Sequence, residues 1–428
     1  MEDVLTKPSK LSSWQSLLFS FFSLYFFFYI FPFPVGYNGN LDSLTTGYYK
    51  AFNTLIVWFG HIFFHRSITN ITDNGSGDRA FNYVQAFTMF VLALIGIIIW
   101  YFFVKRKSAT RILYWLYLYT QLYLSVTLVR YGLEKIIKAQ FPFPYYGLTE
   151  TYAESSPMRL MINFMGYSTS YNLFTGAIEV ITGWLILFRK TSLTGALIAV
   201  AALSNILLMN IGYDVPIKLH VCNLLLMALY IATPFAGSLC HLFVSDKPIH
   251  HTTNPDSFIY HKKRNPVVTG GMMLLASLLL YSNLQLTRLK YKTNGDGAFE
   301  NTPLFGIYNV RTFIKNNDTL LPLITDTSQW KTLSIIYKKR ATVRMMNDST
   351  NQCRFVTDTS TKTMVLTDQD DTAYQANFIY KQPDAMHLVL NGKVKNDSVE
   401  IWLEKQDMKK FRLVNHEFHW IHESLDNR

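Results

Sequence analysis

The chain has 428 residues, of which 49% are hydrophobic and only 16% are charged, and its formal net charge is +11. The length allows two or three domains, and the basic excess lies beside apolar stretches without interleaved aromatic residues, which favours membrane topology over nucleic-acid binding. The three cysteines form no CxxC pair, so neither a disulfide framework nor a zinc site is expected.

The N-terminal region predicts a membrane anchor. Lys7 and Lys10 precede an apolar run from Trp14 to Phe33, and no small-residue cleavage site follows it. A secretory signal peptide would carry such a site. We therefore expect an uncleaved anchor.

Seven stretches are apolar enough and long enough to cross a membrane, which takes about 20 residues. They are 14–33, 82–104, 112–137, 168–188, 192–212, 216–236 and 267–286. The stretch 51–65 is shorter, and we expect a re-entrant or interfacial helix there. Its His61 and His65 are four residues apart and could share a metal, but two ligands are not a site, so we predict an interfacial anchor and no metal.

Clusters of basic residues set the predicted orientation. They follow the second span (105–111), fill the turn after the fourth (189–190) and precede the seventh (262–264). The positive-inside rule places all three in the cytoplasm. This predicts a multi-pass inner-membrane protein with a cytoplasmic N-terminus and an extracytoplasmic C-terminal domain.

The chain changes character after Arg288. From Gly306 onward, short β-rich runs alternate with turn signals, which predicts a small antiparallel barrel or sandwich. The expected strands open at Gly306 and continue at Trp330–Tyr337, Ala341–Met346, Cys353–Thr357, Thr363–Leu366, Tyr374–Tyr380, His387–Leu390 and Val399–Leu403. The Gly-x-Tyr opening and the spacing are weakly lipocalin-like. A barrel filled by side chains is favoured over one that holds a small ligand.

Together these signals predict four regions. An N-terminal membrane segment spans 1–111, a four-helix membrane module spans 112–236, a cytoplasmic linker with the seventh span covers 237–290, and the β-domain occupies 291–428. The fold class is mainly α: a polytopic helix bundle with a C-terminal β-domain. The linker is rich in histidine, at irregular spacing that does not favour a metal site (His241, His250, His251, His261).

The strongest functional signal is a set of polar residues within membrane-grade hydrophobic sequence. Charged groups at bilayer depth usually pair inside a bundle or line a cavity. Arg130 and Glu134 share a helix face, Lys135 follows, and Glu179 lies between glycines on a face of small residues that would point into the bundle. Glu179 needs Arg130, the natural candidate, or Lys135 within about 4 Å. A structural ion pair and a functional one are equally consistent with this pattern.

A second group surrounds the turn between the fifth and sixth spans. Asp214 precedes Pro216 and could cap the following helix, while Lys218 could extend to the membrane interface. His220 is either a neutral ring hydrogen-bonded within the bundle or a ligand. We predict one ligand-binding pocket that opens to the outside and is lined by Arg130, Glu134, Lys135, Glu179, Asn210, Asp214, Lys218 and His220.

Residues 112–236 resemble the DoxX family, a four-span membrane module. The motifs are Gly132-Leu-Glu-Lys135, then Glu179-Val-Ile-Thr-Gly183-Trp-Leu-Ile-Leu, then Arg189-Lys-Thr-Ser-Leu-Thr-Gly195-Ala-Leu. The whole chain is similar to longer, Bacteroidetes-type members, which carry extra N-terminal spans, a turn like Asn210–Lys218 and a C-terminal extension. The resemblance implies quinone-linked chemistry and a part in respiratory or thiol redox balance.

No soluble-enzyme motif occurs in the sequence, so whether the protein is an enzyme stays open at this point. The first hypothesis is an inner-membrane accessory protein that holds a quinone-like or lipid molecule in an outer-leaflet polar pocket. The alternative is a non-catalytic lipid-binding or envelope-assembly protein whose β-domain docks a partner. The expected partners are membrane lipids and a membrane or periplasmic protein, without nucleic acid.

Overall fold

The computed structural model describes residues 13–35, 42–68, 76–104, 106–236, 239, 266–300, 302–369, 371, 374–416 and 420. The chain forms two compact units. The first comprises Met1–Ile137, Pro157–Met161 and Ser168–Thr287, and the second comprises Lys138–Ser156, Ile162–Tyr167 and Arg288–Arg428. The His-rich linker, Cys240 and the basic residues at 262–264 lie outside the described residues.

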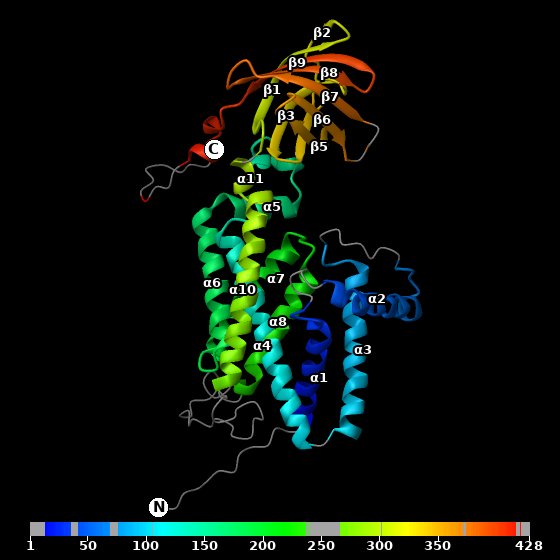
Figure 1. Ribbon diagram of the computed structural model, residues 1–428, viewed down its shortest axis with the longest axis vertical. Helices are drawn as coiled ribbons and strands as arrows, with labels where there is room; N and C mark the ends of the chain where they lie inside the picture. Colours follow the sequence, from blue (N-terminus) through cyan, green and yellow to red (C-terminus); the bar gives the residue numbers. More distant parts are fainter. Residues whose placement is uncertain are drawn as a thin grey trace, which may run out of the picture. The chain divides into compact units, whose positions relative to one another are not determined.

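The first unit is the predicted helix bundle (Figure 1). Its helices are α1 (Ser13–Ile30), α2 (Asp42–Phe64), α3 (Ala80–Phe103), α4 (Arg106–Ile136), α6 (Thr169–Leu187), α7 (Ser192–Gly212), α8 (Lys218–Ala232) and most of α10 (Pro266–Asn294). The short α5 (Pro157–Tyr167) is divided between the two units. Apolar side chains from α1, α3, α4, α6, α7, α8 and α10 form its main core.

Among the described residues, five helices are long and apolar enough to cross a membrane: those at Ala80–Phe103, Ala109–Ile136, Ser192–Gly212, Lys218–Phe235 and Pro266–Asn294. The other two predicted spans correspond to α1, with 18 residues, and α6, with 19. Polar residues and Glu179 lower the hydropathy of α6. The predicted polytopic bundle is therefore confirmed as a fold class.

The helix predicted at 51–65 is longer than expected and lies crosswise to the neighbouring α3 (Figure 1). It begins at Asp42, in a polar stretch with Thr45, Thr46 and Gly47 that has neither high hydropathy nor strong helix propensity. Ile56 and Phe59 pack on Phe81 and Val84 of α3. The opposite side remains exposed, including Trp58 and Ile62. Such a two-sided helix suits a boundary between apolar and polar surroundings.

Glycines allow α4 and α6 to form the most extensive helix contact in the bundle. A Cβ atom on Gly132 would lie 2.5 Å from the carbonyl oxygen of Gly176, and one on Gly183 would lie 2.7 Å from that of Ser125. Backbones approach this closely only where side chains are absent. The Ser125 hydroxyl then donates to the Gly183 carbonyl at 2.7 Å. The predicted small-residue face of α6 does point into the bundle.

The second unit contains a closed antiparallel β-barrel. Its strands are β1 (Gly306–Lys315), β2 (Asp318–Leu320), β3 (Trp330–Tyr337), β4 (Arg340–Met345), β5 (Thr350–Asp358), β6 (Thr363–Asp368), β7 (Gln375–Lys381), β8 (His387–Val394) and β9 (Asp397–Lys405). Neighbours pair in the order β2-β1-β3 and then consecutively to β9, and β1 also pairs with β9. That pairing closes eight strands into a barrel and leaves β2 as a short addition.

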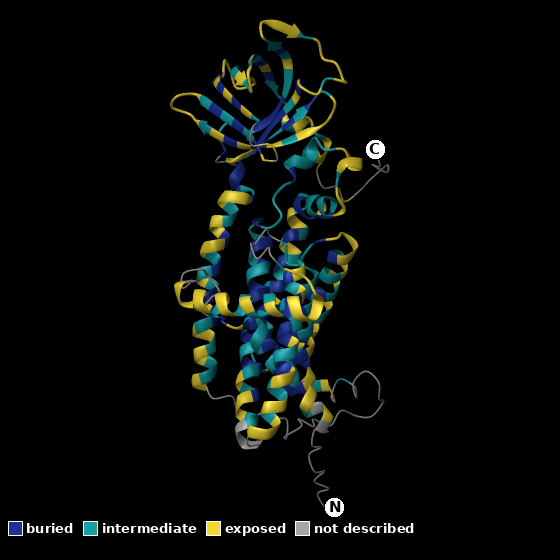
Figure 2. Cartoon of the chain, turned by 90° about the vertical axis from the view of Figure 1, so that its right-hand side faces the viewer, coloured by how far each residue is buried: buried dark blue, intermediate teal, exposed yellow. Residues whose placement is uncertain are grey.

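Apolar side chains from the strands form the core of the barrel, and buried positions recur along its strands (Figure 2). Alternate residues of β7 are buried and exposed, as expected for a strand with one face inward. Trp330, Phe355, Leu388 and Ile401 are fully buried in this core. The arrangement agrees with the expectation of a filled barrel.

The second unit also includes the segment that follows α4. There the 138–156 segment, with two short 3-10 helices (Tyr145–Leu148 and Tyr152–Glu154), packs along the barrel. Arg344 on β4 donates to the carbonyl of Thr149 at 2.8 Å and to the carboxylate of Glu154 at 2.9 Å. We call this segment the strap. The compact β-unit is therefore larger than the predicted domain at 291–428.

Candidate functional site

The buried acid of the bundle is paired with Lys135. The Lys135 ammonium lies 2.6 and 2.8 Å from the two carboxylate oxygens of Glu179, and both side chains are less than a tenth exposed. The pair crosses from α4 to α6 close to the Gly132–Gly176 contact. Arg130, the natural candidate in the sequence, instead pairs with Glu134 at 3.4 Å on its own helix. The helix register explains this, since Arg130 and Gly132 lie on different faces of α4.

A histidine joins three helices on another side of α4. His220, in the first turn of α8, lies with Nδ1 2.9 Å from the hydroxyl of Tyr29 on α1 and with Nε2 3.1 Å from the hydroxyl of Tyr131 on α4. A neutral imidazole donates at one nitrogen and accepts at the other. One tyrosine hydroxyl therefore accepts a hydrogen bond from the imidazole ring, and the other donates a hydrogen bond to it. Exchange of the tautomer would reverse both bonds.

These residues border a cavity of about 340 Å³, which we call the tyrosine–histidine cavity. That volume lies at the lower end of the usual range for small-molecule sites. Five elements contribute to its wall: α1 and its following turn, α2, α3, α4 and α8. The lining residues are Tyr29, Ile30, Phe31, Pro32, Phe33, Tyr48, Tyr49, Phe52, Gln85, Met89, Tyr123, Thr127, Arg130, Tyr131 and His220.

Two polar groups on α4 are available to a molecule in this cavity. The Arg130 side chain is 38% exposed, although it lies within the bundle. Thr127, one turn earlier, is only 4% exposed, and its hydroxyl has no hydrogen-bond partner among the described residues. A buried hydroxyl without a partner is costly, so its position in a cavity wall indicates a bound group or water. With their aromatic surroundings, these groups suit a ring that carries oxygen acceptors.

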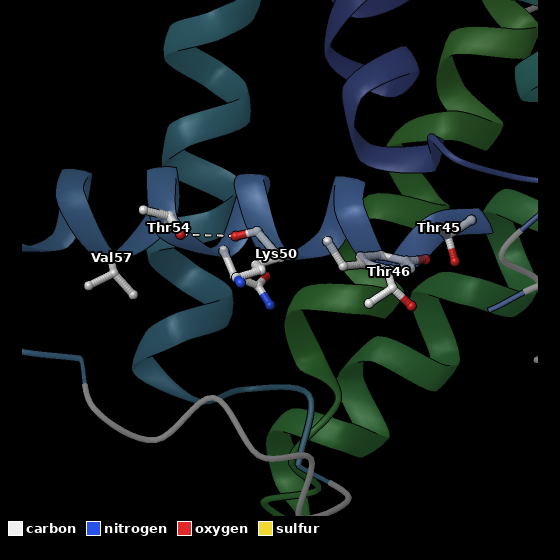
Figure 3. A pocket seen from close by; sticks show the side chains of 7 residues that line it. Thr45, Thr46, Lys50, Thr54 and Val57 are labelled. Atoms are coloured by element: carbon white, nitrogen blue, oxygen red, sulfur yellow. Dashed lines mark hydrogen bonds between the residues drawn. The ribbon is translucent and has the colours of Figure 1, made fainter. Parts of the chain in front are cut away.

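The crosswise helix α2 covers part of this cavity with Tyr48, Tyr49 and Phe52. The Tyr48 hydroxyl donates to the Phe31 carbonyl at 3.4 Å and so connects α2 to the end of α1. Along α2 lies a second hollow, which shares Tyr49 with the cavity and presents mostly polar side chains (Figure 3). Its lining includes Thr45, Thr46, Lys50, Asn53, Thr54 and Val57.

A third hollow, of about 450 Å³, adjoins the tyrosine–histidine cavity. The two share Tyr29, Gln85, Tyr131 and His220, so this polar group forms the wall between them. The rest of the lining comes mainly from the loop before α3 and the start of that helix, and includes Ser76, Gly77, Arg79 and Asn82. The hydrogen bonds of His220 therefore lie between the tyrosine–histidine cavity and a hollow that borders the loop before α3.

The turn before α8 has a different capping residue from the predicted one. Asp78, from the loop before α3, accepts hydrogen bonds from the backbone amides of Lys218 and Leu219 at 2.8 and 2.9 Å. Asp214 instead has a positive φ of 49° and an 87% exposed side chain, and it pairs with the Lys218 ammonium at 2.9 Å. The prediction that Asp214 caps this helix is wrong. A residue that is distant in sequence but adjacent in space satisfies the amides better.

The eight predicted site residues therefore fall into three groups. Arg130 and His220 line the tyrosine–histidine cavity, and Glu134 pairs with Arg130. Lys135 and Glu179 form the α4–α6 ion pair. Asp214 and Lys218 belong to the turn before α8, where Asn210 is buried and its carbonyl accepts from Val215 at 2.8 Å.

Four cavity residues were missed by the sequence reasoning: Tyr29, Gln85, Thr127 and Tyr131. Tyrosine and threonine are common in apolar spans, and their hydroxyls usually bond to local carbonyls. Only the long-range partners of these tyrosines mark them as site residues. Gln85 had a usable signal, because an amide within a strongly apolar span is unusual.

The described residues contain no cluster of three His, Cys, Asp or Glu side chains placed to hold a metal ion. His61 and His65 are both exposed, and His65 lies beyond the end of α2 with a φ of 50°. Cys222 and Cys353 are free thiols. Nothing in these ranges therefore points to a metal centre.

Comparison with known proteins gives one short similarity. Over 98 residues the chain is 30% identical to the uncharacterized protein YwoB of Bacillus subtilis (strain 168). The match covers 23% of this chain and 62% of YwoB, so the chain spans less than two thirds of that relative's length. No family model matches the chain, and no solved structure gives a significant match. The function is therefore argued from the site.

Proposed function

We propose that this protein is an inner-membrane accessory protein that binds a quinone-like molecule in the tyrosine–histidine cavity. The observation that carries the proposal is the buried hydroxyl of Thr127, which has no partner among the described residues and lies in the same aromatic wall as Arg130. A quinone ring would stack among the aromatic side chains and accept hydrogen bonds from Arg130 and Thr127. The resemblance to the DoxX family supports a place in respiratory or thiol redox balance.

Within this proposal, the Tyr29–His220–Tyr131 chain has a specific role. Its hydrogen bonds connect the cavity wall to the neighbouring hollow beside the loop before α3. A reversal of the imidazole tautomer would move a proton from one side of the ring to the other. The Tyr29–His220–Tyr131 chain is therefore suited to exchange protons between a bound ring and the neighbouring hollow. Electrons would come from a partner protein.

The binding test uses two threonines that differ only in location. Thr127 and Thr182 are both buried and both have an unpartnered hydroxyl, but Thr182 does not line the cavity. Purified full-length protein would be titrated with a short-chain ubiquinone analogue. We expect Thr127→Val to weaken binding about fivefold, the value of one neutral hydrogen bond, and Arg130→Gln to weaken it by more than tenfold.

The control Thr182→Val should leave the affinity unchanged. Unaltered affinity in both Thr127→Val and Arg130→Gln would rule out the cavity as the binding site.

Organic extraction of the purified protein separates the proposal from its alternative, because a quinone has a characteristic ultraviolet absorbance and a phospholipid has none. Extracts that contain phospholipid alone would favour the second function.

That second function is a non-catalytic lipid-binding or envelope-assembly protein whose β-domain docks a partner. The filled barrel core supports it, since a barrel without interior space can offer only its surface. In either case we propose that the N-terminus is cytoplasmic and that the barrel lies outside the cytoplasm.

A further inference from the structure

Charge is distributed unevenly between the two ends of the barrel. The β3–β4 and β5–β6 turns lie at one end and carry Lys338, Lys339 and Lys362. The turns at the other end are more acidic and include Asp348 and Asp371. We define the basic end by its exposed cations: Lys338, Lys339, Arg340, Arg354 and Lys362.

The cations of the basic end are not neutralised by the protein. In the described part of the chain, none of the five takes part in an ion pair or a side-chain hydrogen bond. Register even places Arg340 directly opposite Arg354 on neighbouring strands. Like charges in that position destabilise a sheet. Elsewhere on the barrel, by contrast, Lys331 pairs with Asp348 at 2.6 Å.

Acidic residues near the basic end are occupied by their own turns. Asp358 accepts from the amide of Ser360 at 2.8 Å. Asp384 accepts from the amide of Met386 and lies 2.8 Å from the His387 ring. These carboxylates keep their negative charge, but the five cations outnumber them, so the basic end keeps an excess of positive charge.

The basic end lies close to the end of a membrane-length helix. Within the second unit, the ring of Phe299 on α11 (Gly297–Glu300) packs against Tyr337, with centroids 5.5 Å apart, and Tyr337 immediately precedes Lys338. Phe299 follows the last residue of α10 by only five positions. Five residues span at most about 18 Å. The predicted span ends at residue 286 and α10 continues to Asn294, so a short helical stem and at most five further residues connect the basic end to the end of the span.

From this combination of charge and position we propose that the basic end binds the phosphate-bearing headgroups of anionic lipids. The partner is the membrane surface itself, because α10 anchors the barrel beside it. Juxtamembrane lysines and arginines are attracted to anionic leaflets, with a gain of about fivefold in association for each residue. The contact would fix the barrel against the membrane independently of what the tyrosine–histidine cavity binds.

The test places full-length protein in nanodiscs of zwitterionic lipid, with or without anionic phosphatidylglycerol. A fluorophore is attached through Thr361→Cys, in the turn beside Lys362, after replacement of Cys222, Cys240 and Cys353. Lipid with a spin label on its headgroup quenches the fluorophore at close approach. We expect stronger quenching in anionic discs, and we expect the difference to disappear in about 0.5 M salt, where the screening length is only a few ångströms.

Matched double substitutions separate this contact from general charge effects. Lys338→Gln with Lys339→Gln removes two cations from the basic end and should abolish most of the anionic-lipid difference. Lys393→Gln with Lys395→Gln removes two from the opposite end of the barrel and should leave the difference intact. Equal quenching in both lipids, or equal loss in both double variants, would overturn the proposal.

Discussion

The Lys135–Glu179 ion pair allows the bundle to bury one positive and one negative charge. Each member of the pair is nearly inaccessible, so removal of either partner leaves a buried charge without compensation. Such a loss costs about 3–5 kcal/mol, whereas replacement of both partners by apolar groups is often neutral. The pair therefore makes folding depend on the two residues jointly.

We therefore expect Glu179→Ala to lower the yield of folded protein and its thermal stability in detergent. Adding Lys135→Met should restore part of both. Adding Arg130→Met instead should restore neither, because Arg130 pairs with Glu134. Thermal unfolding followed by size-exclusion chromatography measures the effect, and equal recovery with either second substitution would show that the pairing is not specific.

Asp78 is a second residue whose contacts predict how its substitution changes stability. It accepts from two amides at the start of α8 and lies 3.4 Å from the Lys218 ammonium. Loss of a capping side chain costs about 0.5–2 kcal/mol. We expect Asp78→Ala to lower the melting temperature and to speed amide exchange at Lys218 and Leu219. Asp214→Ala is the control, and if it has the larger effect the assignment of the cap is incorrect.

At the scale of single elements, the sequence predicted regular structure better than it predicted partners. All eight barrel strands were expected, because alternation of buried and exposed residues is a local signal. The three-residue strand β2 and the helix α5 were missed, since short elements carry too little pattern. The cap from Asp78 was missed for another reason, because it depends on a contact across 140 positions of the chain.

Two carboxylates at the attachment of the strap, Glu154 and Asp348, have lowered pKa values. Hydrogen bonds from Lys331 and Arg344 hold the pKa of Asp348 below its usual value, and the backbone amide of Thr151 does the same for the pKa of Glu154. A carboxyl group with a lowered pKa stabilises the folded state above its ordinary pKa, near 4. That contribution is lost as the pH falls through the lowered value.

We therefore expect limited proteolysis within the strap to be slow at neutral pH and to accelerate below about pH 4. Arg344→Ala should accelerate it at neutral pH and reduce its dependence on pH, because Arg344 holds both Glu154 and Asp348. Arg311→Ala serves as the control, since Arg311 pairs with Glu404 elsewhere on the barrel. Cleavage that is insensitive to Arg344→Ala would contradict the role of this arginine.

At the scale of the whole molecule, the two units differ in where their apolar residues lie. The bundle exposes much apolar surface, including most of α3 and α10, as suits a helix bundle in a membrane, while the barrel has its own apolar core. The basic clusters at 105–111, 189–190 and 262–264 predict which side of the membrane each loop occupies.

Reporter fusions test that map. An alkaline phosphatase fusion after Arg428 should be active, because the enzyme folds only outside the cytoplasm. A fusion after Lys190 should be silent, since the predicted cytoplasmic turn lies there. If a cytoplasmic reporter were active after Arg428 and the phosphatase silent, the orientation would be reversed and the proposed site would open on the other side.

The pairing of β1 with β9 has a consequence for how the protein is made. It joins Tyr308 to Lys405, so the first strand of the barrel must wait for the last before its hydrogen bonds are complete. Hairpins between consecutive strands can form early, but a long-range contact of this kind is a slow step. Synthesis must therefore pass Lys405 before the barrel can close, and a chain stopped before Asp397 would carry seven strands with two open edges available for aggregation.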